Sequence, residues 1–272
     1  MSATDLPPHA RERLRGLRNL GQPGGVFTSD FSVNEFLLVR KAGFEPLGLC
    51  VGSCIYHVGF QFANLMKNQE MDVLSQAMYH ARELAMGRMR EEAQTMGADG
   101  IVGVKLTVRG LGWDSDILEF VAIGTGIVHG KGSTAFKGPS GKPFTSDLSG
   151  QDFWTLLQAG YRPLELVMGS CVYHVAHRGL MKVMVQSGQN TELTNFSQAL
   201  YDAREIAMEL MQHEASEAGA EGVVGVDLHE GSHNWQPHVI EFFAVGTAVL
   251  PIDAELLPDT IPDPQFVLSV NS

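Results

Sequence analysis

The chain has 272 residues, a length that fits one or two domains. Its formal net charge of −12 argues against nucleic acid as the main partner, because a polyanion favours a basic surface. Three cysteines are too few for a disulfide framework and indicate a reducing, cytoplasmic setting. The sequence has no signal-peptide pattern and no apolar run near the ~18 residues that a bilayer requires, so we expect no membrane insertion.

The first predicted elements are a short helix and a strand. Ser32 and Glu35 form a helix-start box, and the helix that they open should end at Gly43, a residue type favoured after the last helical turn. Residues 46–58 combine β-forming and small residues with glycines that bend a strand. This opening therefore predicts a helix followed by a bent strand.

A long helix and two further strands follow. Apolar residues recur at three- and four-residue steps from Leu74 to Met96, and Gly97 should end the helix. At ~1.5 Å per residue, a helix of about 25 residues is more than ~35 Å long. Residues 100–106 and 116–128 predict two strands, which we expect to pair in an antiparallel manner.

These elements occur twice in the chain. FTSDFSVNEFLLVRKAGFEPLGLCVGSCIYHV, from Phe27, returns as FTSDLSGQDFWTLLQAGYRPLELVMGSCVYHV, from Phe144. SQAMYHARELAMGRMREEAQTMGADGIVGVKL, from Ser75, returns as SQALYDAREIAMELMQHEASEAGAEGVVGVDL, from Ser197. We interpret this as a tandem duplication with five parts: a flexible arm with a short basic helix (1–25), module 1 (26–128), a Gly/Ser/Lys linker (129–142), module 2 (143–250) and an acidic, Pro-rich tail (251–272).

Each module is expected to be α+β, with a small antiparallel sheet packed on one long helix and a short extra helix before it. Three strands and one helix close a core only marginally. The exposed apolar surface therefore predicts association of modules, within one chain or between chains.

The segment Gly-Ser-Cys-x-Tyr-His offers candidate ligands for a transition metal ion. Cys54 and His57 occur in module 1, and Cys171 and His174 occur at the matching places in module 2. Residues three apart in a regular strand point to opposite faces, so both could bind one ion only at a turn or with a second subunit. The alternative is a buried cysteine beside a hydrogen-bonded histidine.

Two groups of side chains are candidates for a ligand site or an interface. Tyr79 and Arg82 share one face of the first long helix, as Tyr201 and Arg204 do in the second. The expected partners are Glu119 for Arg82 and Glu241 for Arg204, as an ion pair between helix and sheet or as an anion clamp between subunits. Trp113 and Trp235, at matching places in the loop between the last two strands, either stack a planar ligand or pack on a strand.

The stretch AREIAMELMQHEASEAGAEGVVGVDL, with a last strand that closes in Val-Gly-Thr-Ala, resembles the YbjQ-like family, which carries the label of a heavy-metal-binding domain. The resemblance covers most of both repeats. It implies a dodecin-like module that assembles as pentameric rings. Tandem copies leave two arrangements open: two stacked rings of five modules each, or rings that mix both halves.

No serine elbow, phosphate loop or metalloprotease motif occurs, so we expect no enzyme. The leading hypothesis is a ring-forming homo-oligomeric scaffold that binds a metal or a small ligand at module interfaces. The alternatives are a metal-binding protein that uses the Cys-x-x-His pairs, or an adaptor that docks a protein partner through residues 251–272.

Overall fold

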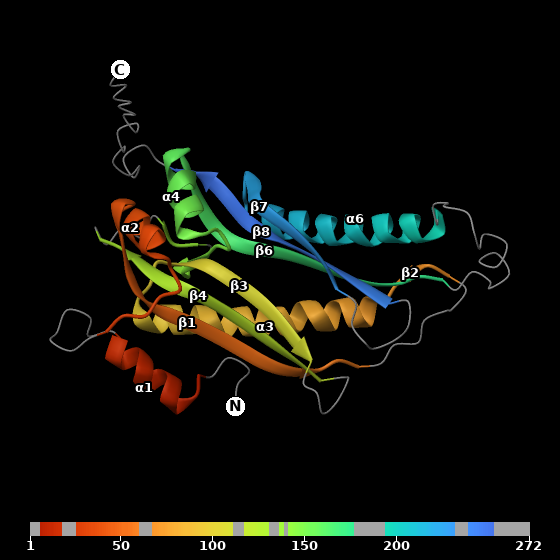
Figure 1. The fold of residues 1–272 in the computed structure, drawn as a ribbon, viewed down its shortest axis with the longest axis horizontal. Helices are drawn as coiled ribbons and strands as arrows, with labels where there is room; N and C mark the ends of the chain where they lie inside the picture. The colour runs from red at the N-terminus through yellow and green to blue at the C-terminus, as the bar shows by residue number, and fades with distance from the viewer. Residues whose placement is uncertain are drawn as a thin grey trace, which may run out of the picture.

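The computed structural model describes residues 6–17, 26–59, 67–110, 117–130, 136–138, 141–176, 194–231 and 239–252. Within these residues the chain is α+β and contains two similar modules, as predicted (Figure 1). Module 1 consists of β1 (Phe44–His57), α3 (Asp72–Met96), β3 (Gly100–Gly110) and β4 (Ile117–His129). Module 2 consists of β6 (Tyr161–His174), α6 (Thr194–Glu217), β7 (Gly222–Gly231) and β8 (Val239–Pro251). The other described elements are α1 (Pro8–Leu17), α2 (Val33–Lys41), α4 (Gly150–Gln158) and the short strands β2 (Gln69–Glu70) and β5 (Phe144–Thr145).

Local sequence signals set the helix ends. The capping box that opens α2 is complete, because the Ser32 side chain accepts from the Glu35 amide and the Glu35 carboxylate accepts from the Ser32 amide. Gly97 follows α3 with a φ of 83°, a left-handed conformation that favours glycine. The predicted helix start and helix end are therefore confirmed.

Each module packs its long helix across an antiparallel sheet in which the last strand is central. β4 lies between β1 and β3, and β8 lies between β6 and β7. The helix approaches the first strand very closely at a glycine in both modules. A Cβ added at Gly52 would lie 2.0 Å from the carbonyl oxygen of Ala85, and one added at Gly169 would lie 2.0 Å from that of Ala207. These glycines allow the helix to contact the strand backbone.

The two modules exchange short strands, which the sequence did not predict. β5, from the start of the second repeat, pairs in parallel with β3 of module 1. β2, from module 1, pairs antiparallel with β6 of module 2. Each sheet therefore gains a fourth strand from the other half of the chain.

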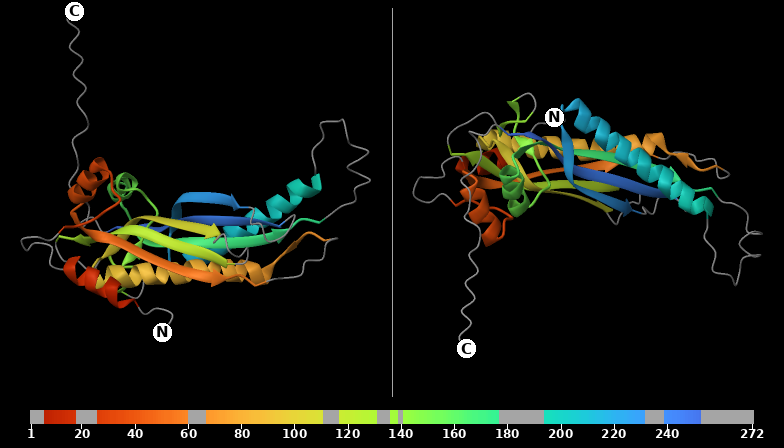
Figure 2. Two further views of the ribbon diagram at one scale, coloured as in Figure 1. Left: turned by 60° about the horizontal axis from the view of Figure 1, so that its bottom comes forward. Right: turned by 90° about the horizontal axis from the view of Figure 1, so that it is seen from above.

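Helix α3 lies between the two sheets and packs on both. One hydrophobic cluster joins α3 and β1 with the module 2 residues Leu166, Met168, Val172, Phe243 and Val245. A second junction forms where α2 packs against α4, at one end of the molecule (Figure 2). Its core contains Phe44, Phe144, Phe153 and also Phe136, which belongs to the predicted linker and is buried. The modules therefore complete each other's interior.

Helix α1 lies alongside α3 (Figure 1). Leu14 of α1 is fully buried in the cluster around α3, and Leu6 just before the helix is buried there too. The N-terminal segment therefore contributes to the core of module 1. Of the helices in the described ranges, none has the length and apolarity that would cross a membrane.

Candidate functional site

Arg82 of α3 is held between the two modules. Its guanidinium Nη1 lies 2.7 Å from Glu241 Oε1 and 3.2 Å from Ser170 Oγ, and both partners belong to module 2. Ser170 donates to the same carboxylate oxygen at 2.8 Å. The Arg82 guanidinium also lies 3.9 Å from the ring centroid of Phe243. The side chains of Arg82 and Glu241 are each only 4% exposed, so this is a buried ion pair that joins helix and sheet across the module boundary.

This pairing corrects a prediction. Arg82 was expected to pair with Glu119 of its own module, and Arg204 with Glu241. Instead Arg82 takes Glu241, which is the repeat counterpart of Glu119. The prediction was wrong because it assumed that each long helix serves only its own sheet, whereas α3 is shared by two.

Tyr79 makes a second contact across the boundary. Its hydroxyl donates to Glu214 Oε1 of α6 at 3.3 Å, and the amide of Met168 donates to the other oxygen of that carboxylate at 2.7 Å. Burial, with the nearby carboxylates of Glu83 and Glu165, raises the pKa of Glu214 to about 7. Burial beside Glu214 also raises the pKa of Tyr79, so the phenol remains a donor.

The counterparts of these residues in the other repeat lie at the surface. Arg204, the counterpart of Arg82, stacks on the ring of Tyr201 at 4.4 Å and pairs with the neighbouring Glu205 at 3.3 Å. Tyr201, the counterpart of Tyr79, is 57% exposed. Glu119, the counterpart of Glu241, is half-buried on β4, opposite Arg109 in the sheet register. The structure thus forms one copy of the contact of Arg82 with Ser170 and Glu241, which we call the clamp. Arg204 and Glu119, which would form a second copy, lie apart.

The sheet faces show the same asymmetry. The face of β6 that α3 covers includes Val172, which is fully buried, and Ser170, which is 2% exposed. The matching face of β1 carries Ile55, which is 65% exposed, and Ser53, which is also exposed. The same sheet surface is therefore covered in module 2 and open in module 1.

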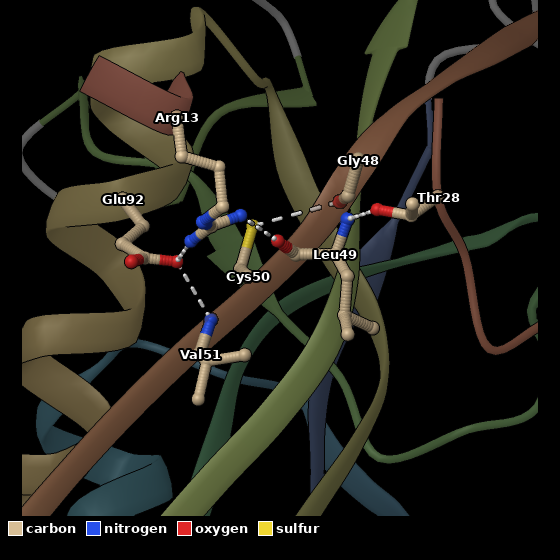
Figure 3. A network of polar contacts seen from close by, with 7 residues as sticks. All are labelled: Arg13, Thr28, Gly48, Leu49, Cys50, Val51 and Glu92. Atoms are coloured by element: carbon tan, nitrogen blue, oxygen red, sulfur yellow. Dashed lines mark hydrogen bonds and ion pairs between the residues drawn. The ribbon is translucent and has the colours of Figure 1, made fainter. Parts of the chain in front are cut away.

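The guanidinium of Arg13 lies beside Glu92, which is the module 1 counterpart of Glu214. Arg13 of α1 lies 2.6 Å from Glu92 Oε2 and donates to the carbonyl oxygen of Leu49 (Figure 3). The amide of Val51 donates to that same Glu92 oxygen at 2.8 Å, as Met168 does to Glu214. Both of these contacts use Glu92 Oε2. Arg13 of helix α1 therefore neutralises the buried carboxylate of module 1 and also bonds one backbone carbonyl of β1.

A cleft of about 440 Å³ lies in the corresponding region of module 2, between α3 and α6. Acidic residues from both modules line it, including Asp72 and Glu70 from module 1 and Glu214 and Glu217 from module 2. Its lining contains no lysine or arginine among the residues that the structure describes. Arg13 thus pairs with Glu92 in module 1, whereas no arginine or lysine among the described lining residues accompanies Glu214 in this cleft of module 2.

The Cys-x-x-His pairs do not converge. Cys54 is buried and its thiol lies 3.2 Å from the carbonyl oxygen of Ala81, whereas His57 is exposed at the end of β1. In module 2 both Cys171 and His174 are buried, and His174 Nδ1 lies 3.3 Å from the carbonyl oxygen of Lys67. Within the described ranges, no cluster of three or more His, Cys, Asp or Glu side chains has the arrangement of a metal site.

The protonation of the thiols is consistent with that geometry. Burial raises the pKa of Cys54 and of Cys171, and burial together with the Glu92 carboxylate raises the pKa of Cys50 to about 12. A thiol binds metal as the thiolate, which these sites disfavour. Trp113, Trp235 and the tail from residue 253 onward lie outside the described residues.

The chain is similar to one protein family and to named proteins of three organisms. The YbjQ family, described as "Putative heavy-metal-binding", matches residues 45–129 and 160–251. A protein of Mycobacterium tuberculosis named "Encapsulin nanocompartment protein" is 45% identical over 272 residues, which is 100% of both chains. A "UPF0145 protein" of Clostridium perfringens is 33% identical over 90 residues, which is 31% of this chain and 83% of the relative. A "UPF0145 protein" of Halorubrum lacusprofundi is 34% identical over 99 residues, which is 35% of this chain and 93% of the relative.

These comparisons agree with the duplication, because the family matches once in each module. The metal in the family description does not fit the side chains seen here, since the cysteines are buried and protonated and the histidines do not join them. We therefore propose no metal-dependent role for these cysteines and histidines.

Proposed function

The chain belongs to the YbjQ family, and we propose that it is a non-enzymatic, self-associating scaffold whose modules complete one another between chains as they do within a chain. One observation carries this proposal. The outer face of the β1–β4 sheet is open, although the same face of the β6–β8 sheet is buried under a helix. Apolar sheet faces are normally covered, because exposing them to water costs about 25 cal/mol per Å².

Two further observations support the proposal. The M. tuberculosis relative, similar over its whole length, is named an encapsulin nanocompartment protein. The described residues also present buried carboxylates that serve as ion-pair and hydrogen-bond partners, as in the Arg82–Glu241 and Tyr79–Glu214 contacts. Both features are consistent with a structural role.

Light scattering after size-exclusion chromatography tests the proposal. We expect the full chain to elute as a discrete multiple of 29.6 kDa. Ile55→Lys, which places a charge on the open sheet face, should shift the protein toward the mass of one chain. Leu210→Lys is the control, because Leu210 is 45% exposed on α6 and its counterpart, Arg88, donates to the carbonyl oxygen of Ser53 in its own module. A wild-type chain that elutes as a monomer at micromolar concentration would rule the scaffold out.

A further inference from the structure

We infer that α6 of one chain docks on the open face of the β1–β4 sheet of a second chain, and that residues 27–31 of that second chain add as a parallel strand to β7 of the first. This inference rests on the proposed function and specifies its contact surface and its partner, a second copy of the chain. It follows from the contact between modules 1 and 2 within the chain, which has two halves. In the first, a helix of module 1 covers the sheet of module 2; in the second, a strand from module 2 extends the sheet of module 1.

The first half of the exchange is the helix on the sheet face. Within the chain, Arg82 and Tyr79 of α3 reach Glu241, Ser170 and Glu214 of module 2. When each of these residues is replaced by its counterpart in the other repeat, the expected contacts between chains are Arg204 with Glu119 and Ser53, and Tyr201 with Glu92. Arg204, Tyr201, Glu119 and Ser53 face solvent or are only partly covered in one chain, whereas Glu92 is buried beside Arg13. Arg13 pairs with Glu92 Oε2, whereas Tyr79 donates to Oε1 of the matching Glu214, so the two contacts use different oxygens of the carboxylate.

The second half is the added strand. Phe144 and Ser146 donate to the carbonyl oxygens of Asp99 and Ile101, and Val104 and Gly103 donate to those of Ser146 and Leu148. The matching groups are those of Glu221, just before β7, and of Val223, Val226 and Gly225 on β7. The matching strand is residues 27–31. A strand edge with unpaired amides and carbonyls is a template for another strand.

Exposure of matched side chains agrees with both halves. Phe144 is fully buried and its counterpart Phe27 is 42% exposed, although each stacks on the equivalent aromatic ring of the following helix. Val104 is 3% exposed and its counterpart Val226 is 44% exposed. Phe44 is fully buried and its counterpart Tyr161 is 37% exposed. Each open residue belongs to the surface that the next chain would cover.

The direction of the contact determines the kind of assembly. Module 2 of one chain meets module 1 of the next, so the interface is head-to-tail and joins two different surfaces. Repeating it produces a series in which modules 1 and 2 alternate, and the series closes into a ring when the rotation between chains divides a full turn. Of the two arrangements that the sequence left open, this one places both halves of every chain in the same ring.

The contact between chains differs from the internal contact at two places. Arg90 pairs with Glu165 at 3.3 Å within the chain, but their counterparts are Gln212 and Gly48, so this ion pair is absent between chains. A Cβ on Gly150 would lie 2.8 Å from Glu35 Cβ, and the counterpart of Gly150 is Val33. The short helices of neighbouring chains must therefore pack farther apart than α2 and α4 do.

Complementary charge reversal tests the inference on the full chain. Glu119→Arg places two arginines in the contact, and Arg204→Glu places two glutamates there, so each variant alone should have the mass of one chain by light scattering. In a 1:1 mixture each contact between unlike variants again joins one arginine to one glutamate, and the two variants can alternate throughout an open series or a ring with an even number of chains. We expect the mixture to assemble into multiples of the chain mass that neither variant forms alone.

The outcomes separate the inference from the proposed function. A monomeric wild-type chain contradicts both. An assembled wild-type chain whose two variants also assemble overturns the docking inference alone, as does a mixture that remains monomeric. Circular dichroism checks that each variant is folded. If one is not, the milder Glu119→Gln and Arg204→Gln replace the pair; each should raise the dissociation constant of the assembly about 10-fold or more, and an unchanged constant would overturn the inference.

Discussion

Arg82→Ala should lower the free energy of unfolding by about 3–5 kcal/mol, the usual cost of leaving one member of a buried ion pair without its partner. Removal of the guanidinium leaves the Glu241 carboxylate in a site where only 4% of that side chain is exposed. Ser170 still donates to it, but a neutral hydroxyl does not compensate a buried charge. Urea denaturation at one fixed protein concentration measures the change.

Two controls show whether the effect arises from the buried pair. Arg40→Ala removes an arginine whose ion pair with Glu45 is about half exposed, and it should change stability by less than about 1 kcal/mol. The double variant Arg82→Met/Glu241→Leu removes both charges and should recover much of the loss, because it strands neither. If Arg82→Ala proves as stable as Arg40→Ala, the clamp does not hold the modules together.

Glu214→Gln should stabilise the protein at pH 8, by an amount on the order of 3 kcal/mol, and should leave it nearly unchanged at pH 4.5. The folded-state pKa of Glu214 is about 7, above the ordinary value of 4.5. The folded state therefore keeps its proton while the unfolded chain loses it, so the contribution of this group to stability is present below pH 4.5 and lost as the pH rises through 7. Glutamine keeps an oxygen that accepts from the Met168 amide but carries no charge.

Glu92→Gln is the matched control in the other repeat. Glu92 has the same strand contact but is neutralised by Arg13 at 2.6 Å, so its substitution removes an ion pair and should destabilise the protein at pH 8. The two substitutions are thus expected to have opposite signs. Denaturation curves from pH 4.5 to 8 that show the same sign for both would contradict the roles assigned to α1 and to the acidic cleft.

The structural features that were predicted correctly are those that depend on local residue patterns. The capping box at Ser32, the end of α3 at Gly97 and the two antiparallel modules all follow from residue type and spacing. The marginal core of each module was also expected, and the sharing of α3 by two sheets is how the chain compensates for it. Such features are local, or follow from composition, so a single sequence contains them.

The partners across the module boundary could not be predicted in the same way. Arg82 can reach a glutamate on either last strand, and only the relative placement of the modules selects Glu241 over Glu119. The docking of Leu14 and Arg13 likewise depends on the position of α1 beside α3. One signal was available: Phe136, a lone aromatic residue in a segment otherwise typical of a linker, indicated that this segment enters a core.

A disulfide trap between chains tests the repeated contact most directly. Ile101 and Thr145 are paired in the strand exchange within the chain, and their counterparts are Val223 and Thr28. Oxidised Thr28→Cys/Val223→Cys protein should give a ladder of covalent multiples of 29.6 kDa on a denaturing gel without reductant, whereas Ile101→Cys/Thr145→Cys should remain a single chain with an internal bond. A Thr28→Cys/Val223→Cys protein that stays at the mass of one chain, under conditions in which the internal pair closes, would contradict the proposal that neighbouring chains repeat the contact between the two modules.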